Sequence, residues 1–141
     1  MKTQCHNPYL PLWEHIPDGE PHVFGDRLYV FGSHDLENGN EFCEQDYVSW
    51  SAPLDDLSDW RYEGVIYRKD QDPYNVNVLP LYAPDVVQGR DGRYYLYYCI
   101  KFQDSINVAV CDTPAGQYEF YGRVQYKDCL LYTSDAADDL I

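Results

Sequence analysis

The sequence predicts an all-β fold that consists of two four-stranded blades of a β-propeller. The first observation is that 15 tyrosines, together with valine and phenylalanine, fall in short runs separated by glycine, aspartate and proline. This is the pattern of short strands, and no segment has a convincing helical pattern. The second observation is that the strand pattern occurs twice, at a spacing of roughly sixty residues.

A β-hairpin is expected near the start of each repeat. Residues 23–31 predict the first hairpin, around the turn Gly25-Asp26, and residues 86–98 predict the second, around Asp91-Gly92. Glycine beside aspartate permits the backbone angles that tight hairpin turns require. Two strands of each repeat are therefore assigned from local sequence alone.

The third and fourth strands are assigned by matching the repeats, and in both copies a proline follows the third strand, at Pro53 and Pro114. Four antiparallel strands in a unit of this length is the composition of a propeller blade. A self-contained eight-stranded β-sandwich is the alternative that the strand count leaves open. The matched segments are 27–29 with 93–95, 48–50 with 108–110, and 60–64 with 118–122.

The composition limits the partners and the location. The formal net charge is −14, and it is still −11 without the three aspartates of residues 129–141. Such a surface repels nucleic-acid phosphates and anionic lipid, so neither partner is expected. No stretch approaches the ~20 apolar residues that span a bilayer, and the first residues lack a signal-peptide core. We predict a cytoplasmic location.

Four cysteines precede residue 129, and they form neither a Cys-x-x-Cys pair nor a cluster with histidine. Zinc is therefore not expected, and the thiols are predicted to be reduced. These cysteines are Cys5, Cys43, Cys99 and Cys111.

Residues 129–141 differ in character from the rest of the chain. Their first eleven residues, CLLYTSDAADD, resemble translated sequencing-library DNA. We expect residues 1–128 to be a partial propeller domain and residues 129–141 to be a non-native tail, with a genuine acidic C-terminal tail as the alternative. Because a propeller needs roughly four to eight blades, residues 1–128 are expected to be a piece of a longer protein.

A Pro-Asp dipeptide recurs at the matching place in both repeats, as Pro17-Asp18 and Pro84-Asp85. The first strand of a propeller blade lines the central channel, so both carboxylates are expected to face one site. Glycoside hydrolysis needs such a pairing, because one carboxylate activates water and a second group protonates the leaving oxygen. A single Pro-Asp would indicate only a turn.

Four motifs in order resemble the N-terminal part of a family 43 glycoside hydrolase. This resemblance implies a five-bladed β-propeller and inverting hydrolysis of O-glycosidic bonds in arabinose- or xylose-containing polysaccharides and oligosaccharides. The motifs are NPYLP at 7–11, IPDGEPH at 16–22, YVFGS at 29–33 and YAPD at 82–85.

The resemblance also implies roles for the two aspartates. Asp18 matches the general base, and Asp85 matches the aspartate that tunes the pKa of the catalytic acid and orients it. That acid is a glutamate which the family places in the third blade, so the fragment itself is expected to be inactive. Glu63 and Glu119 fall on outer strands, where a solvated or salt-bridging role is expected.

Three residues near these motifs are candidates for substrate contact: Trp13, His22 and His34. Packing beside the first strand is the alternative for Trp13 and His22. Gly19 stands where the family often has proline, and Tyr82 where it often has tryptophan. The sugar and the linkage are therefore left open.

The cofactor is unknown from the sequence, and no residue is assigned as a metal ligand. Some family members hold calcium in the channel, where clustered carboxylates favour a hard cation, but the ligands include a histidine of a later blade. A non-catalytic carbohydrate-binding β domain is the alternative function. A purely structural propeller is disfavoured, because it gives no reason for Asp18 and Asp85 to recur.

Overall fold

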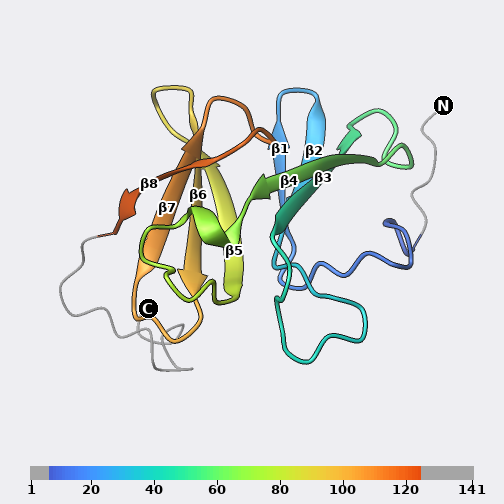
Figure 1. Ribbon diagram of the computed structural model, residues 1–141. Coiled ribbons are helices and arrows are strands. Elements are labelled where there is room, and N and C mark those ends of the chain that lie inside the picture. Colours follow the sequence, from blue (N-terminus) through green and yellow to red (C-terminus); the bar gives the residue numbers. More distant parts are fainter. Residues whose placement is uncertain (1–6, 125–141) are drawn as a thin grey trace, which may run out of the picture.

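The computed structural model describes residues 7–124, and the predicted tail of residues 129–141 lies outside this range. The described residues form eight strands and one 3-10 turn, η1 (Lys69–Gln71), which agrees with the prediction of no true helix (Figure 1). The strands are β1 (Glu20–Phe24), β2 (Arg27–Phe31), β3 (Tyr47–Pro53), β4 (Arg61–Tyr67), β5 (Leu81–Gln88), β6 (Tyr94–Ile100), β7 (Ile106–Cys111) and β8 (Glu119–Arg123).

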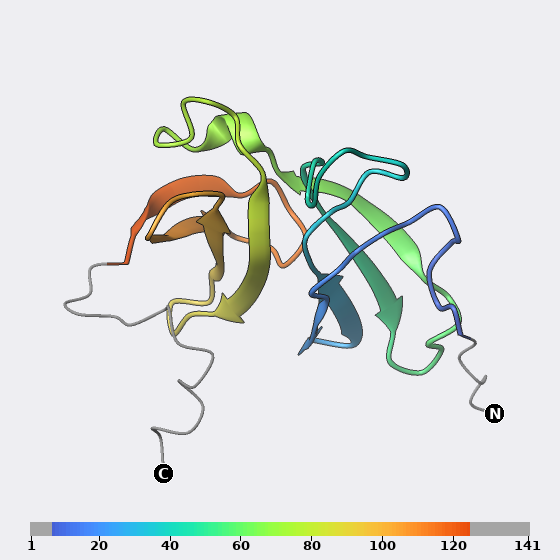
Figure 2. The same cartoon turned by 90° about the horizontal axis from the view of Figure 1, so that it is seen from below.

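The strands form two four-stranded antiparallel sheets, in the orders β1-β2-β3-β4 and β5-β6-β7-β8. Figures 1 and 2 show the two sheets side by side. The first strand of the second sheet, β5, contacts β1 and β2 of the first sheet. Adjacent inner strands are the arrangement of neighbouring propeller blades, so the predicted pair of blades is confirmed and the β-sandwich is not.

The turns follow the local sequence closely. Gly25 has a φ of 62° in the β1–β2 turn, and Gly92 has a φ of 84° in the β5–β6 turn. Glycine adopts this region without the penalty that a Cβ imposes, so both predicted hairpins form. Pro53 is the last residue of β3, as predicted, whereas β7 ends at Cys111 and Pro114 follows only after a turn.

The two Pro-Asp dipeptides occupy different positions relative to their strands. Asp18 precedes β1, but Asp85 lies inside β5, because that strand begins earlier, at Leu81. The register between β5 and β6 shifts between Tyr82 and Asp85, and Ala83 between them has a φ of 41°. Proline has no N–H for the ladder, so it is tolerated in a strand at such a bulge.

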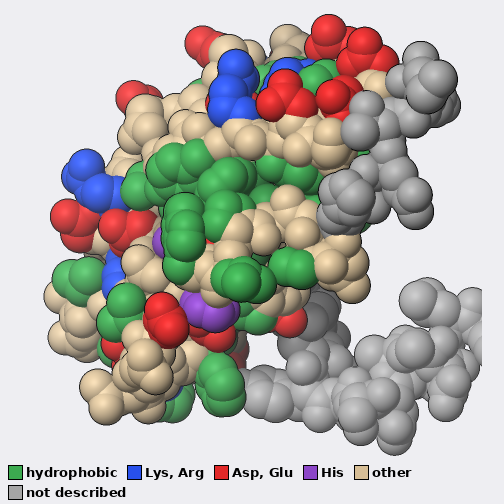
Figure 3. Space-filling model, turned by 90° about the vertical axis from the view of Figure 1, so that its right-hand side faces the viewer, with side chains coloured by type: hydrophobic (Ala, Val, Ile, Leu, Met, Phe, Trp, Pro, Cys, Tyr) green, Lys and Arg blue, Asp and Glu red, His purple; other side chains and the backbone are tan. Residues whose placement is uncertain are grey.

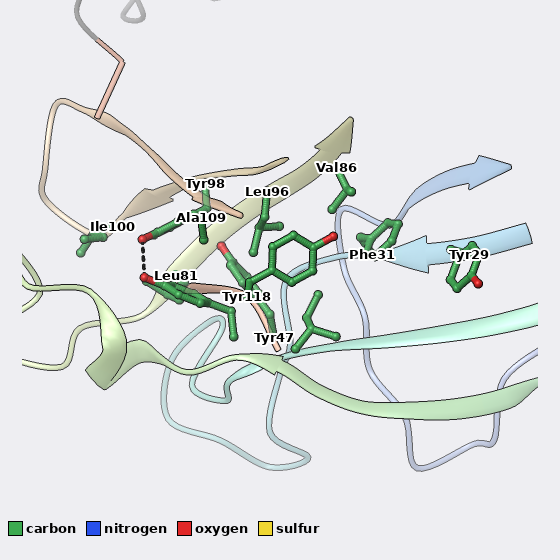
Figure 4. Packing of buried hydrophobic residues seen from close by; sticks show 12 residues of the cluster. Tyr29, Phe31, Tyr47, Leu81, Val86, Leu96, Tyr98, Ile100, Ala109 and Tyr118 are labelled. Carbon is green, nitrogen blue, oxygen red and sulfur yellow. Dashed lines mark hydrogen bonds between the residues drawn. The ribbon is translucent and has the colours of Figure 1, made fainter. Parts of the chain in front are cut away.

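One hydrophobic core is shared by both blades (Figure 4). The backbone N–H of Tyr118, just before β8, donates to the carbonyl of Ile66 on β4 at 2.8 Å, so the loop of one blade is bonded to the outer strand of the other. The core consists of Tyr29, Phe31, Tyr47, Ile66, Tyr67, Leu81, Val86, Leu96, Tyr98, Ile100, Ala109 and Tyr118.

Tyrosine hydroxyls make polar contacts within this core. The hydroxyls of Tyr67 and Tyr98 lie 2.8 Å apart, and Tyr98 donates to the buried carboxylate of Asp72. Tyr47 donates to the carbonyl of Tyr82 at 3.0 Å, across the two blades. Burial is the main cause that raises the pKa of Tyr67 and of Tyr98. The interface between the blades is therefore both apolar and hydrogen-bonded.

Three of the predicted free cysteines lie in the described range. Cys43, Cys99 and Cys111 carry free thiols, and burial raises the pKa of Cys43 and of Cys99. Cys5 lies outside the described residues. Among residues 7–124, no helix has the length and apolar character needed to cross a membrane.

Candidate active site

Asp18 lies in the bend that leads into β1. Its φ of 54° is in the left-handed region, which aspartate adopts more readily than most residues, and Gly19 follows it. The bend packs against the end of β2, since a Cβ on Gly32 would lie 2.3 Å from Ile16 Cγ2 and 2.9 Å from the carbonyl oxygen of Pro17. Backbone packing thus holds Asp18 in place while its side chain stays exposed.

Asp85 points out of β5 toward β1. Its Oδ1 lies 2.6 Å from Nε2 of His22, and the two side chains are 57% and 32% exposed. Because a carboxylate accepts, Nε2 of His22 is the donor. The His22 ring is stacked on Phe24, with centroids 5.7 Å apart, and is tilted toward Phe31. His22 therefore reaches Asp85 from a fixed position on the neighbouring blade.

Ser33 connects the two aspartates. Its fully buried hydroxyl donates to Oδ2 of Asp18 at 3.4 Å and accepts the backbone N–H of Ala83 at 2.8 Å. Ala83 lies two residues before Asp85, within the bulge of β5. Both predicted catalytic carboxylates consequently lie along the contact between β1 and β5.

His34 follows Ser33 but is buried, with 9% of its surface exposed. Its Nδ1 lies 2.8 Å from the carbonyl oxygen of Asp46, and its Nε2 lies 2.9 Å from Oε1 of Glu14. Both ring nitrogens are occupied by protein acceptors. The contact with sugar stays a prediction, and it would require one of these bonds to break.

Trp13 is 62% exposed on the N-terminal segment. Its ring lies against Trp50 of β3, with centroids 6.0 Å apart. The side chain has an open face, which is what stacking on a sugar ring requires. Its substrate contact stays a prediction, as does that of His22.

Comparison with known proteins now identifies the family. The model of glycosyl hydrolases family 43 matches residues 21–135, which include every strand from β2 to β8. The chain belongs to this family. The family that the sequence motifs resemble is thereby confirmed; Asp85 lies within the matched residues, and the roles of Asp18 and Asp85 stay predictions.

Curated relatives carry consistent names. The chain is 64% identical over 129 residues to a xylosidase/arabinosidase of Thermoclostridium stercorarium. The matched region covers 91% of this chain and 27% of that protein. The chain is also 34% identical over 121 residues to xylosidase/arabinosidase 43A of Humicola insolens, covering 77% and 36%. The chain therefore spans between about a quarter and two-fifths of the length of these relatives.

Solved family 43 structures match both blades. One is a β-xylosidase/α-arabinofuranosidase from a compost microbial metagenome, solved with xylotriose in a calcium-free form; it has a TM-score of 0.66 and 27% identity over 84% of this chain and 37% of that one. Another is the family 43 enzyme of Xanthomonas citri complexed with xylose, with a TM-score of 0.65 and 27% identity over 80% and 33%. These matches confirm the propeller fold.

One group of side chains in the described residues could in principle hold a metal ion. Ligand atoms of Glu20, His22 and Asp85 lie within 4.8 Å of one another. Calcium takes six to eight oxygen ligands, whereas this group offers two carboxylates and a ring nitrogen that already donates to one of them. Among the described residues, this group does not fit a calcium site.

The other two acidic candidates lie where they were expected. Glu63 on β4 pairs with Arg61 at 2.7 Å, and Glu119 is exposed on β8. Both are on outer strands, away from the contact between β1 and β5. Ser33 and Glu14 were not predicted, because a serine after a strand and an acid beside a tryptophan carry no local signal of function.

Aromatic and ionisable side chains share exposed surface on the molecule. Figure 3 shows one face on which hydrophobic side chains gather, with acidic side chains and histidine at the border. The exposed aromatic residues include Trp13, Tyr62 and Tyr9. Apolar rings beside carboxylates can stack on a sugar ring while the carboxylates accept hydrogen bonds from its hydroxyls.

Proposed function

We propose that the chain is part of an inverting glycosidase that hydrolyses O-glycosidic bonds in arabinose- and xylose-containing polysaccharides or oligosaccharides. The observation that carries the proposal is the placement of Asp18 and Asp85 along one contact between two blades of a family 43 chain. The names of the curated relatives support the choice of sugars.

Asp18 acts as the general base in this proposal. Ser33 donates to Oδ2, which leaves Oδ1 to accept a proton from water. The water oxygen then bonds to the anomeric carbon on the face opposite the leaving group, and the glycosidic C–O bond breaks. Direct displacement by water inverts the anomeric configuration.

Asp85 acts by orientation and charge. His22 donates to Oδ1 and thereby fixes the orientation of the carboxylate. A negative charge beside the catalytic acid raises the pKa of that acid and keeps it protonated until the leaving oxygen needs the proton. The acid is the glutamate that the family resemblance places beyond residue 128.

The test uses a chimeric enzyme. The matching segment of the Thermoclostridium stercorarium protein is replaced by this chain, where the two are 64% identical over 129 residues. Turnover is measured with a xylo-oligosaccharide and an arabinoxylan oligosaccharide, and proton NMR follows the anomer released first. The Asp18→Asn variant should keep its melting temperature and lose roughly 10²- to 10⁴-fold in kcat.

Asp26→Asn is the matched control, because Asp26 is an exposed aspartate in the β1–β2 turn, eight residues from the proposed base. It should leave kcat unchanged. Near-normal turnover of the Asp18→Asn chimera would show that the base lies elsewhere. Initial release of the retained anomer would exclude direct displacement by water.

The location and the other partners stay predictions of the sequence. Fractionation of cells that express the natural gene would check the cytoplasmic location. A gel-shift titration with DNA and flotation with anionic vesicles would check the predicted lack of affinity for nucleic acid and membrane, which the net charge of −14 motivates.

A further inference from the structure

A buried acid lies outside the pair of catalytic candidates. The side chain of Glu14 is 2% exposed, and its partner His34 has a side chain that is 11% exposed. Glutamate is rarely buried unless it is paired or hydrogen-bonded. The surroundings of Glu14 must therefore stabilise its carboxyl group specifically.

The carboxyl group of Glu14 has three donors around it. His34 Nε2 lies 2.9 Å from Oε1, Trp50 Nε1 donates to Oε2 at 2.7 Å, and the backbone N–H of His15 donates to Oε1 at 3.2 Å. These donors come from the end of β2, from β3 and from the N-terminal segment itself. Glu14 thus joins three parts of the first blade.

The two ring nitrogens of His34 each face an oxygen atom of another residue. Its Nδ1 faces the carbonyl oxygen of Asp46, which can only accept, so Nδ1 carries a hydrogen. Its Nε2 faces Glu14, which also accepts bonds from Trp50 and His15. Since Nδ1 already donates to Asp46, one hydrogen lies between Nε2 of His34 and Oε1 of Glu14.

The titratable groups next to this pair include Asp46 and the ring of His15, whose buried Nε2 has no hydrogen-bond partner among the described residues. Asp35 is adjacent to His34 in sequence, and its carboxylate accepts the N–H of Cys43. Tyr62 lies on the Trp50 side; burial, followed by the charge of Glu14, raises the pKa of its phenol. No cationic side chain among the hydrogen-bond partners described for Glu14 competes with His34 for the carboxylate.

The same segment leads directly to Asp18. The N–H of Asp35 donates to the carbonyl of His15 at 3.0 Å, and Ser33 donates to Asp18 at 3.4 Å. Residues 14–18 therefore run beside residues 32–35, bonded at both ends. The contact with Glu14 closes one end of this pairing, and Asp18 lies at the other.

We propose that Glu14 and His34 form a buried ion pair that positions the Asp18 bend. Both are positioning residues, because neither is placed in contact with the reacting atoms. The ion pair stands on the geometry alone, whereas its effect on turnover rests on the proposed function. Glutamine at position 14 sets an NH2 group against donors that face a carboxyl group in this structure, so the segment shifts to restore its hydrogen bonds and Asp18 moves with it.

The first experiment needs no turnover. The 141-residue chain, which has four histidines, is labelled with nitrogen-15 in histidine, and His34→Gln assigns the His34 signals. At about pH 8 an ordinary imidazole, with a pKa of about 6.5, is neutral. We expect both ring nitrogens of His34 to carry hydrogen there, and Glu14→Gln to remove this behaviour. A bare Nε2 on His34 at that pH would disprove the ion pair.

The second experiment measures the position of Asp18. Amide signals of Asp18 and Gly19 should shift in Glu14→Gln but not in Glu63→Gln, which removes a matched acid of the same blade that pairs with Arg61 on β4. In the chimeric enzyme, Glu14→Gln should lower kcat by up to about 10²-fold with a small change in KM, as for misplacement of a catalytic group by about 1 Å.

The outcomes separate the two proposals. An inactive unsubstituted chimera would reject the proposed function and leave the NMR result intact. Unchanged amide signals, or an unchanged kcat in a Glu14→Gln chimera that turns over, would reject the positioning role. A fall in melting temperature alone, with kcat per folded molecule retained, would mean that the pair only stabilises the blade.

Discussion

The hydroxyl of Ser33 in the first blade accepts the backbone N–H of Ala83 in the second at 2.8 Å, across fifty residues of sequence. The same hydroxyl donates to Asp18. One buried serine thus fixes the bend of the first aspartate to the bulge that carries the second. The relative position of the two carboxylates is set within residues 18–85, by contacts that both blades share.

Replacement of Ser33 by alanine should disturb both partners together. The N–H of Ala83 loses its acceptor, and because Ala83 is itself exposed the unfolding free energy should fall by only about 0.5–1.5 kcal/mol. Asp18 also loses its donor, so the chimeric enzyme should lose between about 10- and 100-fold in kcat. Urea denaturation and steady-state kinetics measure the two effects.

Ser49→Ala is the control for Ser33→Ala. Ser49 is equally buried, and its hydroxyl donates to the carbonyl of Val30 at 3.2 Å, inside the first blade. This variant should lose stability but keep kcat per folded molecule. Equal losses of kcat in both variants would mean that Ser33 has no special relation to the aspartates.

The chain of 141 residues should not hydrolyse natural glycosides by itself. In the proposed mechanism Asp18 supplies the base only, and without a carboxylic acid roughly 6.5–9.5 Å from it the leaving alkoxide would depart unprotonated. The purified chain is assayed with an arabinoxylan oligosaccharide beside aryl xyloside and aryl arabinofuranoside, because aryl leaving groups need little protonation. Turnover of the oligosaccharide that vanishes in Asp18→Asn would contradict this prediction.

Replacement of Tyr98 by phenylalanine should weaken the contact between the blades. Its hydroxyl is hydrogen-bonded to the hydroxyl of Tyr67 and donates to the carboxylate of Asp72. The Tyr98 side chain is almost completely buried. Leaving these partners unsatisfied should lower the unfolding free energy by about 1–3 kcal/mol, measured from the urea midpoint. Tyr121→Phe, at a site that is 59% exposed, should change it by less than about 0.5 kcal/mol.

Alkaline pH should unfold the chain through its buried tyrosines. Burial raises the pKa of Tyr47, Tyr67, Tyr98 and Tyr118 above the ordinary value of about 10. The folded state then holds protons that the unfolded state releases, so this stabilisation is complete below pH 10 and is lost as the pH rises above it. Each such group adds up to about 1.4 kcal/mol per pH unit to the loss.

Urea midpoints between about pH 8 and pH 11 would show this loss, with tyrosinate absorbance followed in parallel. The slope should be smaller in Tyr118→Phe, which lacks one of the buried phenols. If these four phenols ionise before the chain unfolds, the mechanism is wrong.

Local signals predicted most of the fold. Gly25 and Gly92 determine the hairpin turns because the backbone angles there favour glycine, and such effects depend on neighbouring residues only. The bulge of β5 was missed, although Pro84 inside a strand is a local sign of one. The internal repeat predicts the remaining strands, the third and fourth of each blade.

The site was predicted less completely than the fold. The recurring dipeptide predicts the two aspartates as a pair, and the structure places both along one contact between blades. The bonds from Ser33 to Ala83 and from Glu14 to Trp50 join residues 50 and 36 positions apart. Such contacts depend on how finished strands pack, so no nearby sequence pattern encodes them.

The shared core has a consequence for how the protein is made on the ribosome. Tyr118 is fully buried, and its N–H bonds the carbonyl of Ile66. Until residues 98 and 118 have left the exit tunnel, Tyr67 lacks its contact with Tyr98 and Ile66 lacks its bond from Tyr118. Because the blades share these contacts, we expect them to mature as one cooperative unit during translation, with the nascent first blade as the species that a chaperone would meet.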